Sequence, residues 1–343
     1  MKAIVIHRPG SYDRLVLEER EAPPLPPGHV RIAVTACGIN YADCIIRMGL
    51  YASAKEYVGW PITPGFEVAG TVAECGDGVD DLREGDEILA VTRFGGYASE
   101  IVVPRHQVFR RPKGWTDEQA AVLPAVGLTA WHAAVELARL ERGSKALVHS
   151  AAGGVGGVLV QILRHIGCDV AGVVGGPHKV ETVKSFGAQR VIDKSAEKLW
   201  PAAEAFAPRG YDAIFDANGV ATLRDSYQHI APTGRLVVYG FATMLPRAGE
   251  RKNWLKLAWH YLRTPRFDPL ALTNENRSVM GFNLSYLFEQ TQRLERGMEH
   301  LLHWADEGVI VPPPIVSYAL ADVAEAHRAL ESGRTIGKLV LRP

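Results

Sequence analysis

The chain has 343 residues, with 38 basic and 38 acidic side chains, four cysteines and 47% apolar residues. This length predicts about two domains, and apolar and charged fractions of 47% and 22% are typical of a globular protein, not of a coiled coil or a disordered chain. The balanced charge argues against a general nucleic-acid binder, which clusters basic residues. Scattered cysteines without a CxxC pair indicate neither a disulfide framework nor a zinc finger. Because no signal peptide or long apolar run is found, we expect a soluble cytoplasmic protein.

The first 122 residues contain short stretches with the β-branched or alternating composition of strands. These stretches are residues 30–36, 68–75, 87–91 and 98–103. Glycine and proline turns separate them. Frequent short strands with turn signals between them predict an antiparallel, barrel-like domain.

Beyond residue 124, strand and helix patterns alternate, which is typical of βαβ units and a parallel sheet. Residues 146–149 have the composition of a buried strand, and a glycine loop and a helix with one apolar face follow. Further strands are expected at 170–174, 191–192, 213–215, 235–239 and 279–282. The end of the chain predicts helices at 293–305 and 323–330 and a terminal strand at 338–341.

The glycine loop, residues 151–156 (Ala-Ala-Gly-Gly-Val-Gly), has the position of a dinucleotide-binding loop between a strand and a helix. Glycine lets the backbone approach a pyrophosphate, and the helix N-terminus offers free N–H groups. At the end of the next strand, where NAD enzymes carry an acid, the chain instead has Gly175 and Gly176, followed by Lys179. The missing acid together with this lysine favours NADPH over NADH. On its own, Lys179 could equally be a solvated residue at a helix start.

At this loop the chain resembles a known family. Residues 143–147 and 151–156, with Gln161 and Arg164, are similar to the signature of zinc-free quinone oxidoreductases, within the medium-chain dehydrogenase/reductase superfamily. Ser144 departs from that signature, where a charged or amide residue is usual. The resemblance covers essentially the whole chain, and residues 276–287 are similar to the vesicle amine transport protein branch.

The resemblance implies two domains and a homodimer. The first is a GroES-like β-barrel catalytic domain formed by residues 1–122 and 284–343. The second is a Rossmann NADP-binding domain with a doubly wound parallel sheet, residues 123–283, which carries a basic aromatic insert at 245–277.

The zinc ligands of related alcohol dehydrogenases are missing. Asn40 stands where those relatives have a cysteine ligand, and Phe66 where they have a histidine ligand. An amide and a phenyl ring do not replace thiolate and imidazole ligands. Glu67 remains, but one carboxylate is not a metal site. We therefore expect no metal.

The resemblance also indicates where NADPH lies. Asn40 and Tyr51 are expected to approach the nicotinamide or its ribose. Lys194 and Lys338 could bind the cofactor or be surface charges. The full set of cofactor-binding residues implied by the family is Asn40, Tyr51, Thr129, Gly153, Gly154, Val155, Gly156, Gly176, Lys179, Lys194, Asn218, Gly240, Phe241, Gly281, Phe282, Asn283 and Lys338.

Without zinc to polarise a carbonyl, the substrate must accept hydride more readily than a simple ketone does. Quinones and α,β-unsaturated carbonyl compounds do so, because they delocalise the incoming charge onto oxygen. The protein then positions the reactants and stabilises the developing oxyanion. Asn40, Tyr51 and Tyr97 are candidate donors, although each tyrosine could equally be a packing residue. The sequence therefore predicts an NADPH-dependent, zinc-independent oxidoreductase acting on a small-molecule quinone or enone.

Two other functions remain open. The insert at 245–277 has seven basic residues interleaved with aromatic ones. Trp254, Leu255, Ala258, Trp259 and Leu262 would share one helical face, which could lie on an anionic membrane, pack against a partner subunit or cover the substrate. This pattern is compatible with an NADPH-binding interaction protein with weak turnover. A zinc alcohol dehydrogenase is the third reading, and metal analysis would distinguish it.

Overall fold

The computed structural model describes residues 1–244 and 254–343, which form two compact units. Unit 1 comprises Met1–Leu128 and Leu284–Pro343, and unit 2 comprises Thr129–Asn283. The chain passes from unit 1 to unit 2 after Leu128, within helix α4 (Pro124–Trp131), and returns to unit 1 at Leu284.

Unit 1 is built on a seven-stranded sheet, and in its strand 29–39 the β-branched residues Val30, Ile32 and Val34 are buried and alternate with more exposed residues. The order of the sheet is β14-β15-β3-β4-β5-β7, with β6 also paired to β3. The strands are β3 (His29–Ile39), β4 (Glu67–Cys75), β5 (Glu87–Val91), β6 (Glu100–Pro104), β7 (Val108–Arg110), β14 (Ile315–Ala319) and β15 (Lys338–Arg342). Strands β1 (Lys2–Val5) and β2 (Val16–Glu19) form a separate antiparallel pair.

Strand β15 comes from the end of the chain, yet it pairs with β3 near the beginning. Leu339 lies opposite Ile39, and β3 in turn pairs with β4, where Cys37 faces Val68. The carboxyl end of β3, the start of β4 and the start of β15 therefore lie together. This arrangement assembles one half of the candidate site.

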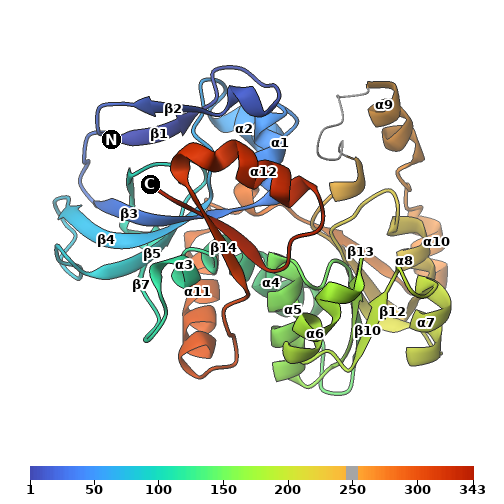
Figure 1. Cartoon of the computed structure of the whole chain (residues 1–343). Helices are drawn as coiled ribbons and strands as arrows, with labels where there is room; N and C mark the ends of the chain where they lie inside the picture. The colour runs from blue at the N-terminus through green and yellow to red at the C-terminus, as the bar shows by residue number, and fades with distance from the viewer. Residues whose placement is uncertain (245–253) are drawn as a thin grey trace. The chain divides into compact units, whose positions relative to one another are not determined.

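Helices accompany this sheet, and α3 (Asp117–Ala120) and α12 (Val323–Glu331) pack against its strands. The helices also include α1 (Tyr41–Arg47), α2 (Ala52–Tyr57), α4 and α11 (Thr291–Asp306). Val323 and Ala326 of α12 join Ile32 and Leu339 in the main apolar core. The helices expected at 293–305 and 323–330 are α11 and α12, drawn in orange and red in Figure 1.

Unit 2 contains a six-stranded parallel sheet of order β10-β9-β8-β11-β12-β13, the doubly wound order of dinucleotide-binding domains. The strands are β8 (Lys145–Val148), β9 (Asp169–Val174), β10 (Arg190–Asp193), β11 (Tyr211–Asp216), β12 (Ile230–Val238) and β13 (Ser278–Gly281). The predicted α/β fold class, a GroES-like domain with a Rossmann domain, is confirmed.

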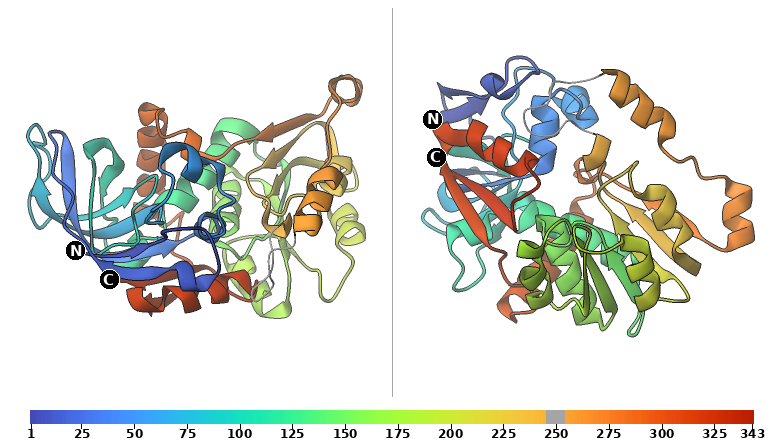
Figure 2. Two further views of the ribbon diagram at one scale, coloured as in Figure 1. Left: turned by 90° about the horizontal axis from the view of Figure 1, so that it is seen from above. Right: turned by 45° about the vertical axis from the view of Figure 1, so that its right-hand side comes forward.

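Four helices pack against this parallel sheet (Figures 1 and 2), namely α5 (Gly154–Ile166), α6 (Val180–Ser185), α7 (Leu199–Phe206) and α8 (Leu223–Gln228). Two further helices, α9 (Trp254–Arg263) and α10 (Pro269–Glu275), lie between β12 and β13 in the chain. A π-helical turn, His132–Ala138, continues α4. The apolar stripe predicted for α5 is buried at Val158, Leu159 and Ile162. Gly167 ends this helix with φ 95°, a conformation that glycine adopts without strain.

Part of the basic insert forms regular structure. Residues 245–253, which include Arg247, Arg251 and Lys252, lie outside the described residues. The described remainder forms α9 and α10. Elsewhere, the run Asp117–Ala138 is long and apolar enough to cross a membrane, but 78% of its apolar window is buried inside the protein. Burial of this kind is expected of a core helix.

Candidate active site

The glycine loop of unit 2 adopts the conformation that a phosphate-binding turn needs. Gly153 stands at the N-cap of α5 with an extended backbone and no side chain over the helix end. A Cβ atom on Gly156 would lie 2.3 Å from the carbonyl oxygen of Ser150, so only glycine fits there. The loop therefore folds tightly onto the first turn of α5, whose N–H groups can bind an anion.

Nearly all the cofactor-binding residues predicted in unit 2 lie at one edge of the sheet. They follow or end successive strands, where open α/β sheets bind ligands. They are Gly153–Gly156 after β8, Gly176 and Lys179 after β9, Lys194 after β10, Asn218 after β11, Gly240 and Phe241 after β12, and Gly281, Phe282 and Asn283 at the end of β13. Thr129 does not follow a strand but belongs to α4.

The turn after β11 is held by Asp216, a buried carboxylate that sequence reasoning missed. Its Oδ1 accepts hydrogen bonds from the backbone N–H groups of Asn218, at 2.8 Å, and Gly219, at 3.1 Å. Asn218 is thereby directed toward the glycine loop, where the hydroxyl of Ser150 donates to its Oδ1 at 3.1 Å. Two of the predicted strand-end segments are thus in direct contact.

A second layer of buried polar groups supports this turn. Ser226 donates to Asp216 at 3.0 Å, and the Nε2 of His149 lies 3.0 Å from the Ser226 hydroxyl. Burial lowers the pKa of His149 to about 4. This histidine is therefore neutral near pH 7, and it acts as a structural hydrogen-bonding group behind the loop.

The electrostatics after β9 and β10 suit an anionic ligand. Lys179 is half-buried, and burial together with the nearby Lys194 ammonium lowers its pKa. Within residues 1–244 and 254–343, no carboxylate forms an ion pair with Lys194. Two neighbouring ammonium groups repel each other, and a bound phosphate would relieve that repulsion.

In unit 1, the predicted residue Asn40 belongs to a compact buried cluster with Glu67 and Lys338. The Nζ of Lys338 lies 2.8 Å from both the Oδ1 of Asn40 and the Oε1 of Glu67. The Nδ2 of Asn40 donates to the same Glu67 oxygen at 2.8 Å. The second oxygen of Glu67 accepts from the backbone N–H of Ala125 at 2.8 Å.

The structure supports neither of the two roles predicted for Lys338, a surface charge or a contact with the cofactor. It is 4% exposed, so it is not a surface charge. Its ammonium group has three N–H donors. Besides Asn40 and Glu67, it donates to the carbonyl oxygen of Ile39 at 2.6 Å. Because these three bonds use every donor, the predicted contact between Lys338 and the cofactor does not fit this geometry.

Tyr51 stands at the start of α2 and is half-buried. Its hydroxyl lies 2.8 Å from the Oγ of Ser285, and its ring meets Phe66 edge-on at a centroid distance of 5.9 Å. Phe66, which the resemblance places at the histidine-ligand position, precedes Glu67 in the chain. Tyr51 and the Asn40 cluster are therefore linked through consecutive residues 66 and 67.

Tyr97, the third predicted donor, is fully buried. Its hydroxyl lies 3.3 Å from the Nε2 of His327 and also bonds to Asp43. The Oδ2 of Asp43 accepts a hydrogen bond from the backbone N–H of Asn40 at 2.8 Å, and burial raises the pKa of Asp43 to about 7. A side chain enclosed in this way does not reach a substrate, so we leave Tyr97 out of the proposed catalytic set and assign it to the support of Asn40.

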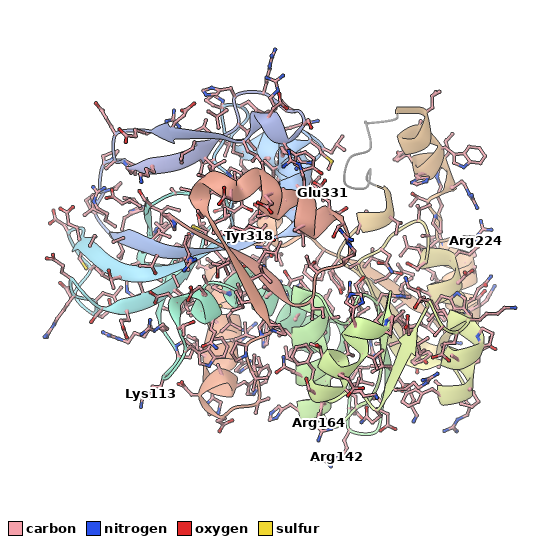
Figure 3. The ribbon with its side chains drawn as sticks, in the orientation of Figure 1. Lys113, Arg142, Arg164, Arg224, Tyr318 and Glu331 are labelled. Atoms are coloured by element: carbon pink, nitrogen blue, oxygen red, sulfur yellow. The ribbon has the colours of Figure 1, made fainter. Side chains whose placement is uncertain are left out.

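Cys44, His327 and Glu331 lie close enough together to ligate a metal ion. However, the Arg47 guanidinium already bonds to two of them, at 2.7 Å to the Oε1 of Glu331 and 3.3 Å to the Nδ1 of His327. A cation within this set would oppose a metal cation. The cluster, whose Glu331 is labelled in Figure 3, is better described as a buried hydrogen-bond network.

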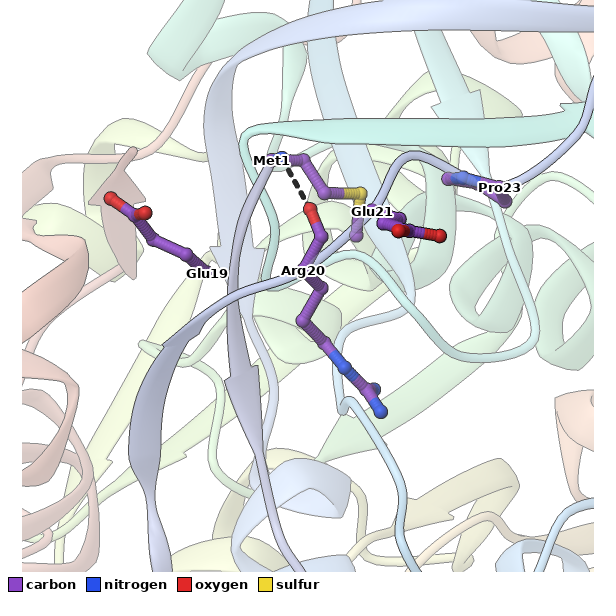
Figure 4. Close-up of a pocket in the computed structure, with 5 residues that line it drawn as sticks. All are labelled: Met1, Glu19, Arg20, Glu21 and Pro23. Carbon is purple, nitrogen blue, oxygen red and sulfur yellow. Dashed lines mark hydrogen bonds between the residues drawn. The ribbon is translucent and has the colours of Figure 1, made fainter.

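A surface pocket of unit 1 lies away from these residues (Figure 4). It is lined by Met1, Glu19, Arg20, Glu21 and Pro23. The N-terminal ammonium group donates to the Arg20 carbonyl oxygen at 2.6 Å. None of the predicted site residues lines this pocket, so we assign it no role in the chemistry.

Comparisons with known proteins agree with this architecture. Residues 26–113 match the alcohol dehydrogenase GroES-like domain, and residues 186–341 match a zinc-binding dehydrogenase family. The synaptic vesicle membrane protein VAT-1 homolog of Rattus norvegicus is 33% identical over 345 aligned positions, which cover 100% of this chain and 84% of that protein.

Solved structures give the same result. A quinone oxidoreductase of Pseudomonas syringae has a TM-score of 0.85 at 28% identity, with 100% of this chain and 99% of that chain covered. A mycobacterial protein solved in complex with NADPH has a TM-score of 0.86 at 28% identity, with both chains covered completely (100%).

The two units and the strand-end glycine loop define a two-domain protein of the medium-chain dehydrogenase/reductase superfamily. Within that superfamily, the chain belongs to the branch of the VAT-1 homologues and quinone oxidoreductases. The family membership predicted from residues 143–147, 151–156 and 276–287, with Gln161 and Arg164, is thereby confirmed. The family is one of oxidoreductases.

Proposed function

We propose that this protein transfers a hydride from NADPH to a quinone or an α,β-unsaturated carbonyl compound without the help of zinc. The similarity to a quinone oxidoreductase and to a protein solved with NADPH supports this assignment. So does the cluster at Asn40, since an amide held by an internal ion pair stands where zinc-dependent relatives have a metal ligand. That cluster is the observation that carries the proposal.

The residues of unit 2 fit NADPH. The tight turn at Gly156 leaves the N-terminus of α5 open to a pyrophosphate. Lys179 and Lys194, with no acid at the end of β9, suit the 2′-phosphate that distinguishes NADPH from NADH. When bound, the nicotinamide supplies the hydride to an electron-poor carbon of the substrate.

The residues of unit 1 serve the substrate oxygen. Hydride addition to a quinone or enone places negative charge on that oxygen, and hydrogen-bond donors stabilise the charge as it develops. The Nδ2 of Asn40 and the hydroxyl of Tyr51 are the donors we assign to this task. Solvent then protonates the product, so no dedicated general acid is required.

The test is a titration of the purified protein with NADPH and NADH, followed by NADPH oxidation with a panel of quinones and enones. We expect tighter binding of NADPH and turnover of at least one acceptor. Metal analysis of the same preparation should find less than one zinc ion per chain. Failure to bind either cofactor would refute the proposal.

A second candidate function is an NADPH-binding interaction protein that contacts a membrane surface and turns over slowly. The described part of α9 exposes Leu255, Trp259 and Leu262 on one face, with exposed fractions of 84%, 59% and 72%. Arg263 adds a positive charge at the end of the helix. Apolar and basic side chains on one surface helix favour an anionic bilayer.

Sedimentation with anionic liposomes, alongside the NADPH assay, separates the two functions. Co-sedimentation that is lost in Trp259→Glu, together with no turnover of any acceptor, would favour the interaction protein. Turnover without co-sedimentation would favour the oxidoreductase. Arg142→Glu in unit 2 provides a control for the change of surface charge.

We also infer a cytoplasmic homodimer that pairs through edge strands of the nucleotide domain. Strand β13 is an edge of the six-stranded sheet, and its end residues Ser278 and Gly281 are exposed. All four cysteines are free, and three of them are buried, as expected in a reducing compartment. Light scattering after size-exclusion chromatography tests the dimer.

A further inference from the structure

The buried Lys338 ammonium has no remaining hydrogen-bond donor, although the chain places it beside a predicted catalytic residue. Its three N–H groups are used by the carbonyl oxygen of Ile39, the Oδ1 of Asn40 and the Oε1 of Glu67. A buried lysine that makes three bonds within its own fold is held rigidly. Its function is then exerted through the groups that it holds.

One of those groups is the carboxamide of Asn40, whose orientation is determined by its two charged neighbours. The Oδ1 accepts from Lys338, and the Nδ2 donates to Glu67. Rotating the amide by half a turn would set its NH2 group against the ammonium and its oxygen against the carboxylate. Both hydrogen bonds would then be lost, and like partial charges would face each other.

This orientation leaves one donor on Asn40. The Nδ2 has two N–H groups, and Glu67 uses one of them. Asn40 is half-buried, so the residue is partly exposed in unit 1. The ammonium bound to the Oδ1 withdraws electron density from the amide, which strengthens the hydrogen bond that the second N–H can donate.

We propose that Glu67 and Lys338 are positioning residues that hold Asn40 with an N–H donor toward the substrate oxygen. This inference rests on the proposed function. The ion pair keeps the Asn40 oxygen away from the developing oxyanion, which that oxygen would repel. The positive charge of Lys338 reaches the substrate through the amide instead of by direct contact.

The proposal differs in a measurable way from a cofactor-binding role for Lys338. A cofactor contact affects the affinity for NADPH. A positioning residue for an oxyanion donor affects kcat and leaves cofactor affinity unchanged, because the interaction it supports is made in the transition state. The two roles are separated by measuring kcat and the NADPH dissociation constant on the same variants.

The experiment compares Lys338→Met, Asn40→Ala and Asn40→Asp in the full chain. We expect Lys338→Met to lower kcat at least tenfold, with the NADPH dissociation constant, measured by fluorescence titration, changed less than twofold. Asn40→Ala should lower kcat by about 10²-fold, the scale for loss of one oxyanion donor. Asn40→Asp should be slower than Asn40→Ala, because it places a carboxylate oxygen beside the developing charge.

Two controls keep the test decisive. The double variant Glu67→Gln/Lys338→Met buries no unpaired charge, so it should fold even where Lys338→Met does not, and its kcat should still be low. Lys145→Met breaks an ion pair with Asp169 in unit 2, whose side chains are 36% and 43% exposed, and should leave kcat unchanged.

The outcomes distinguish a failure of the positioning role from a failure of the proposed function. Weaker NADPH binding with unchanged kcat in Lys338→Met, or full kcat in the double variant, would overturn the positioning role while wild-type turnover upholds the proposed function. A wild-type protein without turnover on any acceptor would overturn both.

Discussion

Lys338 and Glu67 form a buried ion pair, with the Nζ 2.8 Å from the Oε1 and side chains 4% and 0% exposed. The two residues are 271 positions apart in the chain. Strand β3, which pairs with both β15 and β4, brings them together. Breaking such a pair leaves one charge buried without its partner, which is more costly than removing both charges.

The ion pair therefore makes a stability prediction that is independent of activity. Lys338→Met should lower the free energy of unfolding by about 3–5 kcal/mol, and the double variant Glu67→Gln/Lys338→Met should recover most of that loss. Urea unfolding followed by circular dichroism measures both. Lys145→Met, at a partly exposed pair, should cost about 1 kcal/mol or less. Equal losses in the single and double variants would contradict the pairing.

Lys179 should discriminate between the two cofactors. Lys179→Ala removes the half-buried ammonium assigned to the 2′-phosphate, so the NADPH dissociation constant should rise about tenfold, a loss of ~1.4 kcal/mol, while that for NADH stays the same. Lys184→Ala, five residues further on in α6 and paired with Glu181, should change neither affinity. An equal loss for both cofactors would exclude a phosphate contact for Lys179.

Tyr51 and Ser285 allow a chemical role to be separated from a structural one. Tyr51→Phe removes the hydroxyl and should lower kcat about tenfold or more if that group donates to the substrate. Ser285→Ala breaks the same 2.8 Å hydrogen bond but keeps the tyrosine hydroxyl, so it should have a much smaller effect on kcat. Steady-state kinetics with one quinone measure both variants. Similar kinetic losses in the two would indicate that the bond only supports the fold.

Because of His327, the stability of unit 1 should decrease as the pH falls into the acid range. Burial lowers its pKa from 6.5 to about 3, and the Arg47 guanidinium adds to the effect. Between these values the unfolded chain binds more protons than the folded one. The stabilisation is therefore complete above pH 6.5 and is lost as the pH falls toward 3.

The variant His327→Gln tests the direction of this pH dependence. It should be less stable than the wild type at pH 7.5, because the bonds to Tyr97 and Arg47 change. Below pH 6.5 the difference in the free energy of unfolding between wild type and variant should narrow by up to about 1.4 kcal/mol per pH unit, since glutamine does not take up a proton. His7→Gln, at a side chain that is 57% exposed, is the matched control. A constant difference from pH 7.5 to 5 would contradict the assignment.

Much of the fold could be predicted from local patterns. The apolar stripe of α5, the glycine at its end and the alternation of strands and helices require only neighbouring residues, and the structure has them. Short strands such as β2 and β14 were not predicted, because edge strands that are half-exposed carry little periodic signal. Local patterns do not mark the point between the two units, because helix α4 runs across it.

In the candidate site, too, some residues could be placed from local patterns and others could not. Strand-end residues of unit 2 could be placed from the order of strands and the glycine loop. The roles of Ser285 and Glu67 could not, because each depends on a partner distant in the chain. Asp216 instead bonds to nearby residues, and its place at the end of a strand just before Asn218 is a signal that the sequence carries. Tyr97 is fully buried, and a motif does not report burial.

By itself, the sequence determined the family, the two-domain plan and the expectation of NADPH, because each depends on residue types at short spacing. The resemblance also predicts that Asn40 and Phe66 stand at the metal-ligand positions of zinc-dependent relatives. The tertiary structure alone decided where Lys338 lies. Pairing of β15 with β3 and of β3 with β4 buries the lysine against Glu67 and Asn40. A charge taken out of water must be matched by nearby polar groups, and only the folded chain brings those groups together.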